Sequence, residues 1–124
     1  MAKILVVDDN HDNRQILSRL LQFSGHEVTT ADGGQSGLES ARANPPDLIL
    51  MDLEMPEIDG WTATLLIKAE PPLVDVPVIA VSGYVTHDEI ERAQESGCVD
   101  VIPKPVELDV LIRKVDQHLP ARVG

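Results

Sequence analysis

The sequence has little of several things on which whole classes of protein depend, beginning with cysteine and aromatic residues. Cys98 is the single cysteine among 124 residues, which excludes an intrachain disulfide framework and a zinc site built on several thiolates. It stands between a glycine and a valine, so we expect a small, inert core residue. The aromatic side chains, Phe23, Trp61 and Tyr84, are too few for a platform on which nucleic-acid bases stack.

Positive charge and long apolar runs are equally scarce. Ten lysines and arginines stand against 21 aspartates and glutamates, which gives a net charge of −11. This balance argues against direct binding of nucleic acid, which requires clustered Lys and Arg, and against an anionic membrane surface. The apolar run at residues 4–7 is too short for a signal peptide or a membrane span, so we expect a soluble, cytoplasmic protein.

What the chain does have is enough apolar material for one domain, arranged in alternating patterns. We expect a single domain over residues 1–124, with its core over 3–119. Strands are expected at residues 4–7, 27–31, 48–52, 78–81 and 99–102. Helices are expected around residues 16–21 and at 35–43, 57–69 (with Leu65 and Leu66 towards the sheet), 87–96 and 106–119. Strands joined by single helices run parallel, so the sequence predicts a doubly wound α/β domain with a five-stranded parallel sheet and five helices.

The strand at 48–52 ends abruptly in a carboxylate. Four apolar residues precede Asp52, and Pro56 and Gly60 follow within eight positions. A short apolar run bounded by turn formers indicates a buried strand of a parallel sheet, and open α/β sheets place their chemistry at the carboxyl ends of such strands. Taken alone, Asp52 is explained as well by a solvated turn residue.

Polar residues also follow three other strands. Asp8 and Asp9 come after the first, Ser82 after the fourth and Lys104 after the fifth. Because the carboxyl ends of parallel strands meet at one edge, we expect all of these side chains to converge with Asp52. Carboxylates at close range raise one another's pKa unless a cation joins them. Mg²⁺ suits this role, since it takes one or two carboxylates, a carbonyl and several waters.

These residue types together predict phosphoryl chemistry. A bound Mg²⁺ can also hold a phosphate oxygen, which leaves Asp52 free to attack phosphorus as a nucleophile. Lys104 would neutralise the charge that develops on the phosphoryl oxygens, and Ser82 would donate a hydrogen bond to the attached group.

On these motifs the chain resembles, over essentially its whole length, the receiver domain of two-component response regulators. The matching pieces are Asp8-Asp9, Asp52 with Met-Pro-x-x-Asp-Gly behind it, Ser82, and Lys104-Pro105. The resemblance implies a flavodoxin-like sheet in the order 2-1-3-4-5, as in the single-domain chemotaxis regulator. It also implies a cis peptide bond between Lys104 and Pro105.

The resemblance further implies roles for individual positions. Asp52 would accept a phosphoryl group from a histidine kinase or histidine phosphotransfer protein and become 4-aspartylphosphate. Ser82 and Lys104 would contact that group. The Mg²⁺ ligands would be Asp8 (through water), Asp9, Asp52 and the backbone carbonyl of Glu54. The chain would then not be an enzyme acting on separate substrates. It would transfer a phosphoryl group to itself, hydrolyse it slowly and signal through protein–protein contact with a downstream target that the sequence does not name.

Three positions bear on how such a switch would be read. Many family members carry Tyr or Phe three residues before the lysine, where this chain has Val101, so an aromatic rotamer switch is unavailable there. Tyr84 either flanks the phosphoryl site and tunes hydrolysis or only covers a loop. The carboxylate of Glu54 either orients a water or faces solvent.

The alternatives come from other functional classes. A small aspartyl-nucleophile phosphatase of the haloacid-dehalogenase type also uses a doubly wound sheet, but it needs an acid–base Asp where Glu54 stands and usually extra chain for a substrate cap. A flavin-binding module is disfavoured because Asp8 and Asp9 would repel the flavin phosphate. The tail, residues 120–124, lacks the long linker of a fusion, which favours a stand-alone receiver.

Overall fold

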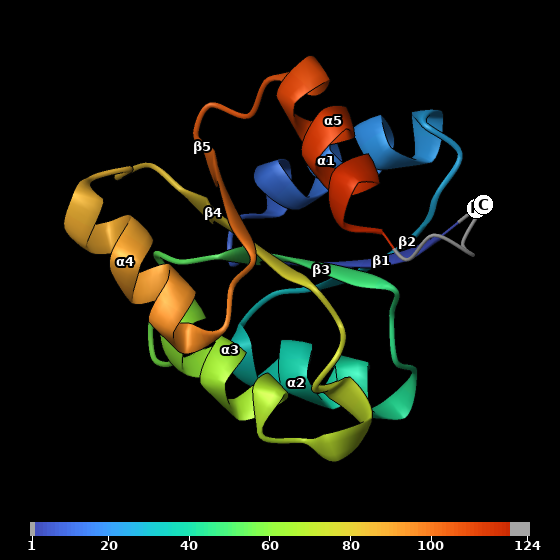
Figure 1. Ribbon diagram of the computed structural model, residues 1–124. Coiled ribbons are helices and arrows are strands. Elements are labelled where there is room, and N and C mark those ends of the chain that lie inside the picture. Colours follow the sequence, from blue (N-terminus) through green and yellow to red (C-terminus); the bar gives the residue numbers. More distant parts are fainter. Residues whose placement is uncertain (1, 120–124) are drawn as a thin grey trace.

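The computed structural model describes residues 2–119, which form one parallel sheet between two layers of helices (Figure 1). Over these residues the sheet has five strands in the order β2-β1-β3-β4-β5. The strands are β1 (Lys3–Val7), β2 (Glu27–Ala31), β3 (Leu48–Asp52), β4 (Val78–Ser82) and β5 (Asp100–Pro103). All neighbouring pairs are parallel. The predicted fold class and strand order are confirmed.

Helices cover both faces of the sheet. They are α1 (His11–Phe23), α2 (Gly34–Ala43), α3 (Gly60–Lys68), α4 (His87–Ser96) and α5 (Leu108–His118), with a short 3₁₀ turn, η1 (Pro71–Leu73). Figure 1 shows α1 and α5 on one face and α2, α3 and α4 on the other. Among the described residues, no helix combines the length and the apolar character that crossing a membrane requires.

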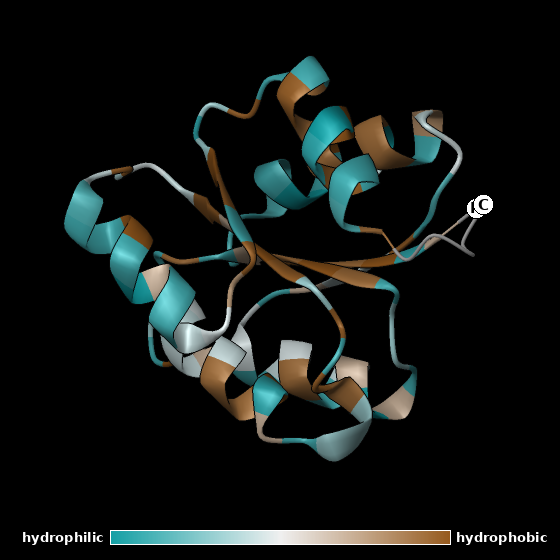
Figure 2. Ribbon diagram, in the orientation of Figure 1, coloured by the Kyte–Doolittle hydropathy of each residue, from teal (hydrophilic) through white to brown (hydrophobic). Residues whose placement is uncertain are grey.

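The central strands are hydrophobic along their length, as Figure 2 shows for β3 and β4. Every residue of β3 is buried, and successive side chains enter opposite halves of the core. Ile49 and Met51 pack with α2, α3 and α4, whereas Leu48 and Leu50 pack with α1 and α5. Burial on both faces explains why the β3 sequence is a continuous apolar run rather than an alternating one. The run therefore places its final carboxylate at the centre of the sheet edge.

The helix after β3 differs from its prediction. It begins at Gly60 rather than at residue 57, because the Asp59 carboxylate caps it by accepting from the Thr62 backbone N–H at 2.8 Å. The prediction that Leu65 and Leu66 face the sheet is wrong, since these side chains are 54% and 41% exposed. The buried side of α3 is formed by smaller residues together with Ile67.

The last elements are shifted slightly from their predicted bounds. β5 covers 100–103 instead of 99–102, and α5 begins at Leu108 instead of 106. Between them, the peptide bond from Lys104 to Pro105 is cis, as the resemblance implies. Residues 120–124, on which the stand-alone prediction rested, lie outside the described residues.

Candidate functional site

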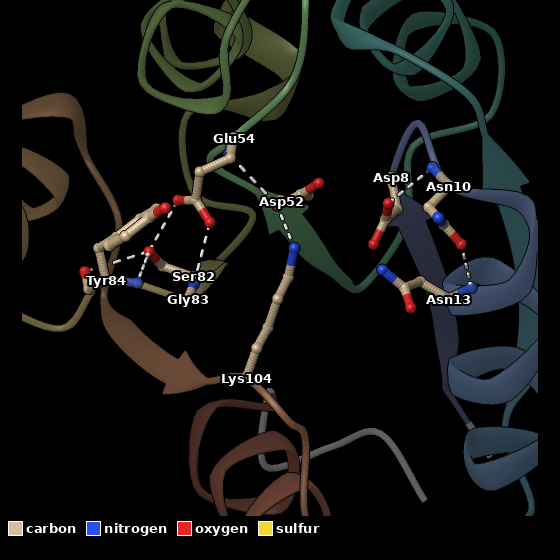
Figure 3. A network of polar contacts seen from close by, with 9 residues as sticks. All are labelled: Asp8, Asn10, Asn13, Asp52, Glu54, Ser82, Gly83, Tyr84 and Lys104. Carbon is tan, nitrogen blue, oxygen red and sulfur yellow. Dashed lines mark hydrogen bonds and ion pairs between the residues drawn. The ribbon is translucent and has the colours of Figure 1, made fainter.

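Asp52 is the final residue of β3, and its side chain is only 2% exposed. Its Oδ1 accepts hydrogen bonds from Lys104 Nζ at 2.9 Å and from the Glu54 backbone N–H at 3.2 Å. Lys104 follows β5, two strands away, and its side chain extends across the sheet edge to reach the carboxylate (Figure 3). The chain thus buries a carboxylate and an ammonium from distant segments in direct contact.

Two further carboxylates lie beside Asp52, both from the loop after β1. Oxygens of Asp8, Asp9 and Asp52 all lie within 4.8 Å of one another. Asp8 is 1% exposed, whereas Asp9 is open to solvent. The Arg14 guanidinium donates to the Asp8 backbone carbonyl at 2.8 Å, which ties this loop to α1. The structure therefore brings together the acidic residues that the strand-end argument expects at one edge.

Asp8 carries an oxygen with unused bonding capacity. Its Oδ1 accepts from the Asn10 backbone N–H at 2.9 Å. Its Oδ2 is buried and has no hydrogen-bond partner within residues 2–119. A buried carboxylate oxygen without a partner is costly, and a hard divalent cation such as Mg²⁺ prefers oxygen donors of this kind. The donor set therefore fits a Mg²⁺ ion.

The burial of Asp52 and Lys104 and the carboxylates around them shift the pKa values of both residues. Burial, reinforced by the neighbouring Asp8 charge, raises the pKa of Asp52 to about 6, although the Lys104 hydrogen bond opposes the rise. Burial works to lower the pKa of Lys104, but the hydrogen bond to Asp52 and the surrounding carboxylates raise it above its ordinary value. The Lys104 ammonium alone does not offset the free-energy cost of ionising the buried Asp52 carboxylate. A second cation at the site would lower that cost.

Ser82 and Glu54 are joined in a way that the sequence analysis missed. The buried Ser82 hydroxyl lies 2.7 Å from Glu54 Oε2, to which it donates, and the Gly83 backbone N–H donates to Glu54 Oε1 at 2.9 Å. Both alternatives for Glu54, orienting a water or facing solvent, are therefore replaced by a contact with the β4–α4 loop. In Figure 3 the Ser82 hydroxyl points towards Glu54 and Tyr84. The register that pairs Asp52 with Val81 could have suggested the contact, because it sets the residues after β3 beside those after β4.

Tyr84 and Val101, the other two positions that bear on the switch, differ in exposure. The Tyr84 side chain is 66% exposed, and its backbone N–H donates to Ser82 Oγ at 3.0 Å. Val101 is buried in β5 at 9% exposure. The position at which many receivers carry an aromatic ring is thus occupied by a small core side chain.

Gly60 lies directly behind the site. A Cβ at this position would meet the backbone carbonyl oxygen of Asp52 and would come within 2.7 Å of the Leu53 Cα. The first turn of α3 can therefore pack against the end of β3 only because residue 60 has no side chain.

A small groove opens beside the acidic cluster, between α1 and the loop that follows β5. It has a volume of about 190 Å³. Its walls include Asp8, Asn13, Ile16, Lys104, Pro105 and Val106. The groove therefore joins an apolar surface to the charged groups of the site.

Comparison with known proteins agrees with this geometry. The family model described as the response regulator receiver domain matches residues 4–116. The polar-differentiation response regulator DivK of Brucella ovis is 34% identical over 116 residues, which are 94% of this chain and 94% of that protein.

Solved structures lead to the same family. Chemotaxis protein CheY4 of Vibrio cholerae has a TM-score of 0.93 at 27% identity, over 96% of this chain and 99% of that one. NtrX from Brucella abortus has a TM-score of 0.87 at 32% identity, over 95% of this chain but 27% of that one. Sequence and structure therefore agree that the chain belongs to the receiver-domain family of two-component response regulators.

Proposed function

We propose that this protein is a phosphorylation-dependent switch in which Asp52 accepts a phosphoryl group from the phosphohistidine of a histidine kinase or histidine phosphotransfer protein. The observation that carries the proposal is the buried Asp52, paired with Lys104 and crowded by two more carboxylates at the sheet edge. A nucleophile, a cation and an oxygen-donor set meet there, as phosphoryl transfer to a carboxylate requires.

The residues divide the transfer step between them. Asp52 Oδ1 is occupied by Lys104 and the Glu54 N–H, so the other oxygen, Oδ2, attacks phosphorus. A P–O bond forms while the P–N bond to the donor imidazole breaks. The leaving nitrogen keeps the bonding electron pair, and the ring departs as neutral imidazole because the phosphohistidine that reacts carries a proton on its other ring nitrogen. Lys104 then donates to a phosphoryl oxygen and stabilises the charge that builds up there.

The metal ligands in this proposal are Asp9, Asp52, the backbone carbonyl of Glu54 and, through water, Asp8. Mg²⁺, when bound, would neutralise the carboxylates and hold a phosphoryl oxygen. The unpartnered Oδ2 of Asp8 and the solvent-exposed Asp9 support this assignment, because one needs a partner and the other opens the site to solvent.

The partners follow from the same site. The groove beside Lys104 has apolar walls from Ile16, Pro105 and Val106, which suit the apolar surface of a docking phosphodonor protein. The output in this proposal is contact with a downstream protein, in the cytoplasm, by a domain whose core spans residues 3–119.

The phosphatase alternative loses its acid–base group in this geometry. Such an enzyme would need a free carboxyl two residues after the nucleophile. The Glu54 carboxylate is instead held by Ser82 and Gly83. The switch is therefore the function that the site supports best.

The test is phosphorylation with acetyl phosphate and Mg²⁺, measured by intact mass. We expect the wild-type protein to gain one hydroxylamine-sensitive phosphoryl group and Asp52→Asn to gain none. Asp12→Asn is the matched control, because Asp12 is an exposed aspartate in the first turn of α1. Labelling of Asp52→Asn at the wild-type level would refute the proposal.

A further inference from the structure

The carboxylate of Glu54 bridges the loop after β3 to the loop after β4 (Figure 3). It accepts from the Ser82 hydroxyl and from the Gly83 backbone N–H at 2.7 and 2.9 Å. Both donors belong to the point where β4 ends and the β4–α4 loop begins. Hydrogen bonds to a carboxylate are stronger than those between neutral groups, so this bridge sets the position of the loop.

One of these donors, the Ser82 hydroxyl, is the group that the proposed function assigns to a phosphoryl group on Asp52. Ser82 follows Val81, which is the strand partner of Asp52, so its hydroxyl lies at the same edge as the acceptor. A hydroxyl has a single proton and can donate to one oxygen at a time. Glu54 and a phosphoryl group on Asp52 therefore compete for the Ser82 proton. The two groups would also repel each other, because both are negative and both would lie within hydrogen-bonding reach of Ser82.

We propose that Glu54 is a latch on the β4–α4 loop: its carboxylate holds Ser82 and Gly83 while Asp52 is bare, and phosphorylation of Asp52 displaces it. The latch rests on the proposed function, since it needs a phosphoryl group at Asp52. It deepens that function by naming the contact that opposes phosphorylation and is exchanged when phosphorylation occurs.

The latch also gives the signal a route that does not require an aromatic residue at position 101. The Ser82 oxygen accepts from the Tyr84 N–H at 3.0 Å, so a turn of this hydroxyl changes a contact of the loop backbone. Tyr84 and Val85 are exposed apolar residues, at 66% and 43%, and they lead into Thr86, which caps α4. Exchange of the Ser82 bond therefore alters a surface that a partner protein can contact.

Helix α4, which follows the β4–α4 loop, is held to α3 by a side-chain contact. The guanidinium of Arg92 in α4 lies 3.9 Å from the ring centroid of Trp61, at the start of α3. This cation–π contact joins α4 to the segment that follows the site. Release of Glu54 is thus expected to move the loop over residues 83–86 more than the body of α4.

The experiment compares Glu54→Ala and Glu54→Gln with the wild-type protein, using beryllofluoride as the phosphoryl mimic at saturating Mg²⁺. Both variants keep the backbone carbonyl of residue 54, and Glu54→Gln also keeps the size of the side chain. We expect the beryllofluoride concentration at half-saturation to fall at least about fivefold in Glu54→Ala, because a bond to a charged acceptor no longer competes. The half-saturation concentration of Glu54→Gln should lie between those of Glu54→Ala and the wild type.

A second readout needs no ligand. The amide chemical shifts of Tyr84 and Val85 in free Glu54→Ala should move from the free wild-type position towards the beryllofluoride-bound one. Glu57→Gln is the control matched in charge, because Glu57 is exposed on the same β3–α3 loop. It should leave both the half-saturation concentration and the free shifts at wild-type values.

The outcomes separate the two proposals. If the wild-type protein takes up neither beryllofluoride nor acetyl phosphate, the proposed function fails. If the wild type responds but Glu54→Ala keeps its half-saturation concentration and its free shifts, the function stands and the latch is refuted. An equal effect of Glu57→Gln would also refute the latch, because the response would then come from net charge.

Discussion

Asp52 and Asp100 are each paired with a lysine at almost the same distance, yet the two pairs differ in character. Lys104 Nζ lies 2.9 Å from Asp52, and Lys114 Nζ lies 2.8 Å from Asp100. The pKa of Asp52 is raised to about 6 by burial, with a further rise from Asp8, while that of Asp100 is lowered. Distance between partners therefore does not determine whether an ion pair is relaxed or strained.

The surroundings account for the difference. Burial also acts to raise the pKa of Asp100, but hydrogen bonds from Lys114, His118 and the Val101 backbone N–H outweigh it. The Asp100 side chain is 23% exposed, against 2% for Asp52. Asp100 thus has several donors and some water, whereas Asp52 has little water and a neighbouring carboxylate. The Asp100–Lys114 pair is therefore a structural contact, whereas the Asp52–Lys104 pair leaves bonding capacity that the proposed Mg²⁺ ion and phosphoryl group would use.

The largest predicted difference between the pairs is in phosphoryl transfer. Lys104→Met should lower the rate of labelling by acetyl phosphate by roughly a hundredfold or more, because it removes a cation from the developing charge. Lys114→Met should leave that rate unchanged. The measurement is the initial rate of phosphoprotein formation at saturating Mg²⁺, and equal losses in the two variants would contradict the assignment of Lys104.

The next difference is in stability without metal. The folded state raises the pKa of Asp52 from 3.8 to about 6, so it binds more protons than the unfolded chain between these values. The stability from this group is present below pH 3.8 and is lost as the pH rises through 6. Asp52→Asn should therefore be more stable than the wild type at pH 7, by about 3 kcal/mol.

This gain should shrink towards zero at pH 4 and should diminish when Mg²⁺ is added to the wild type. The measurement is urea unfolding with and without EDTA at the two pH values. A wild-type protein more stable than Asp52→Asn at pH 7 in EDTA would mean that the site is not strained.

The smallest effect should come from the structural pair. A lowered pKa means that Asp100 stabilises the fold above its unfolded pKa and loses this contribution as the pH falls through its folded pKa. Asp100→Asn should cost about 1 kcal/mol or less at pH 7, as is usual for partly exposed pairs. Thermal unfolding as a function of pH measures this, and a gain in stability would erase the contrast with Asp52.

Most of the architecture could be predicted because it depends on local pattern. The apolar runs ending at Asp8, Asp52 and Ser82 identified strands, and their alternation with helical periodicity required a parallel sheet. The start of α3 was misjudged because capping by Asp59 competes with a continuous polar–apolar pattern. Leu65 and Leu66 were misplaced because the space under α3 is filled by small side chains. Packing of this kind depends on the facing elements and cannot be inferred from one helix alone.

In the candidate site, too, the features that follow from local sequence pattern could be predicted, and those that depend on packing between elements could not. Convergence of Asp8, Asp9 and Asp52 follows from strand ends, because parallel strands end at one edge. The contact of Glu54 with Ser82 depends on a rotamer chosen between two loops. The network around Asp100 depends on how α5 lies against β5. The strand ends determine the backbone positions of the site residues, whereas the surrounding loops and helices determine the directions of their side chains.

The missing side chain at Gly60 has a consequence for how such sequences are compared. The space that a Cβ would fill there is taken by the backbone of Asp52 and Leu53. A related chain could keep every acidic residue, the serine and the lysine, and still have its acceptor pushed out of line by one methyl group at this position. The charged motif alone therefore does not indicate that a related chain can position its acceptor aspartate. The residue that corresponds to Gly60 has to be inspected as well.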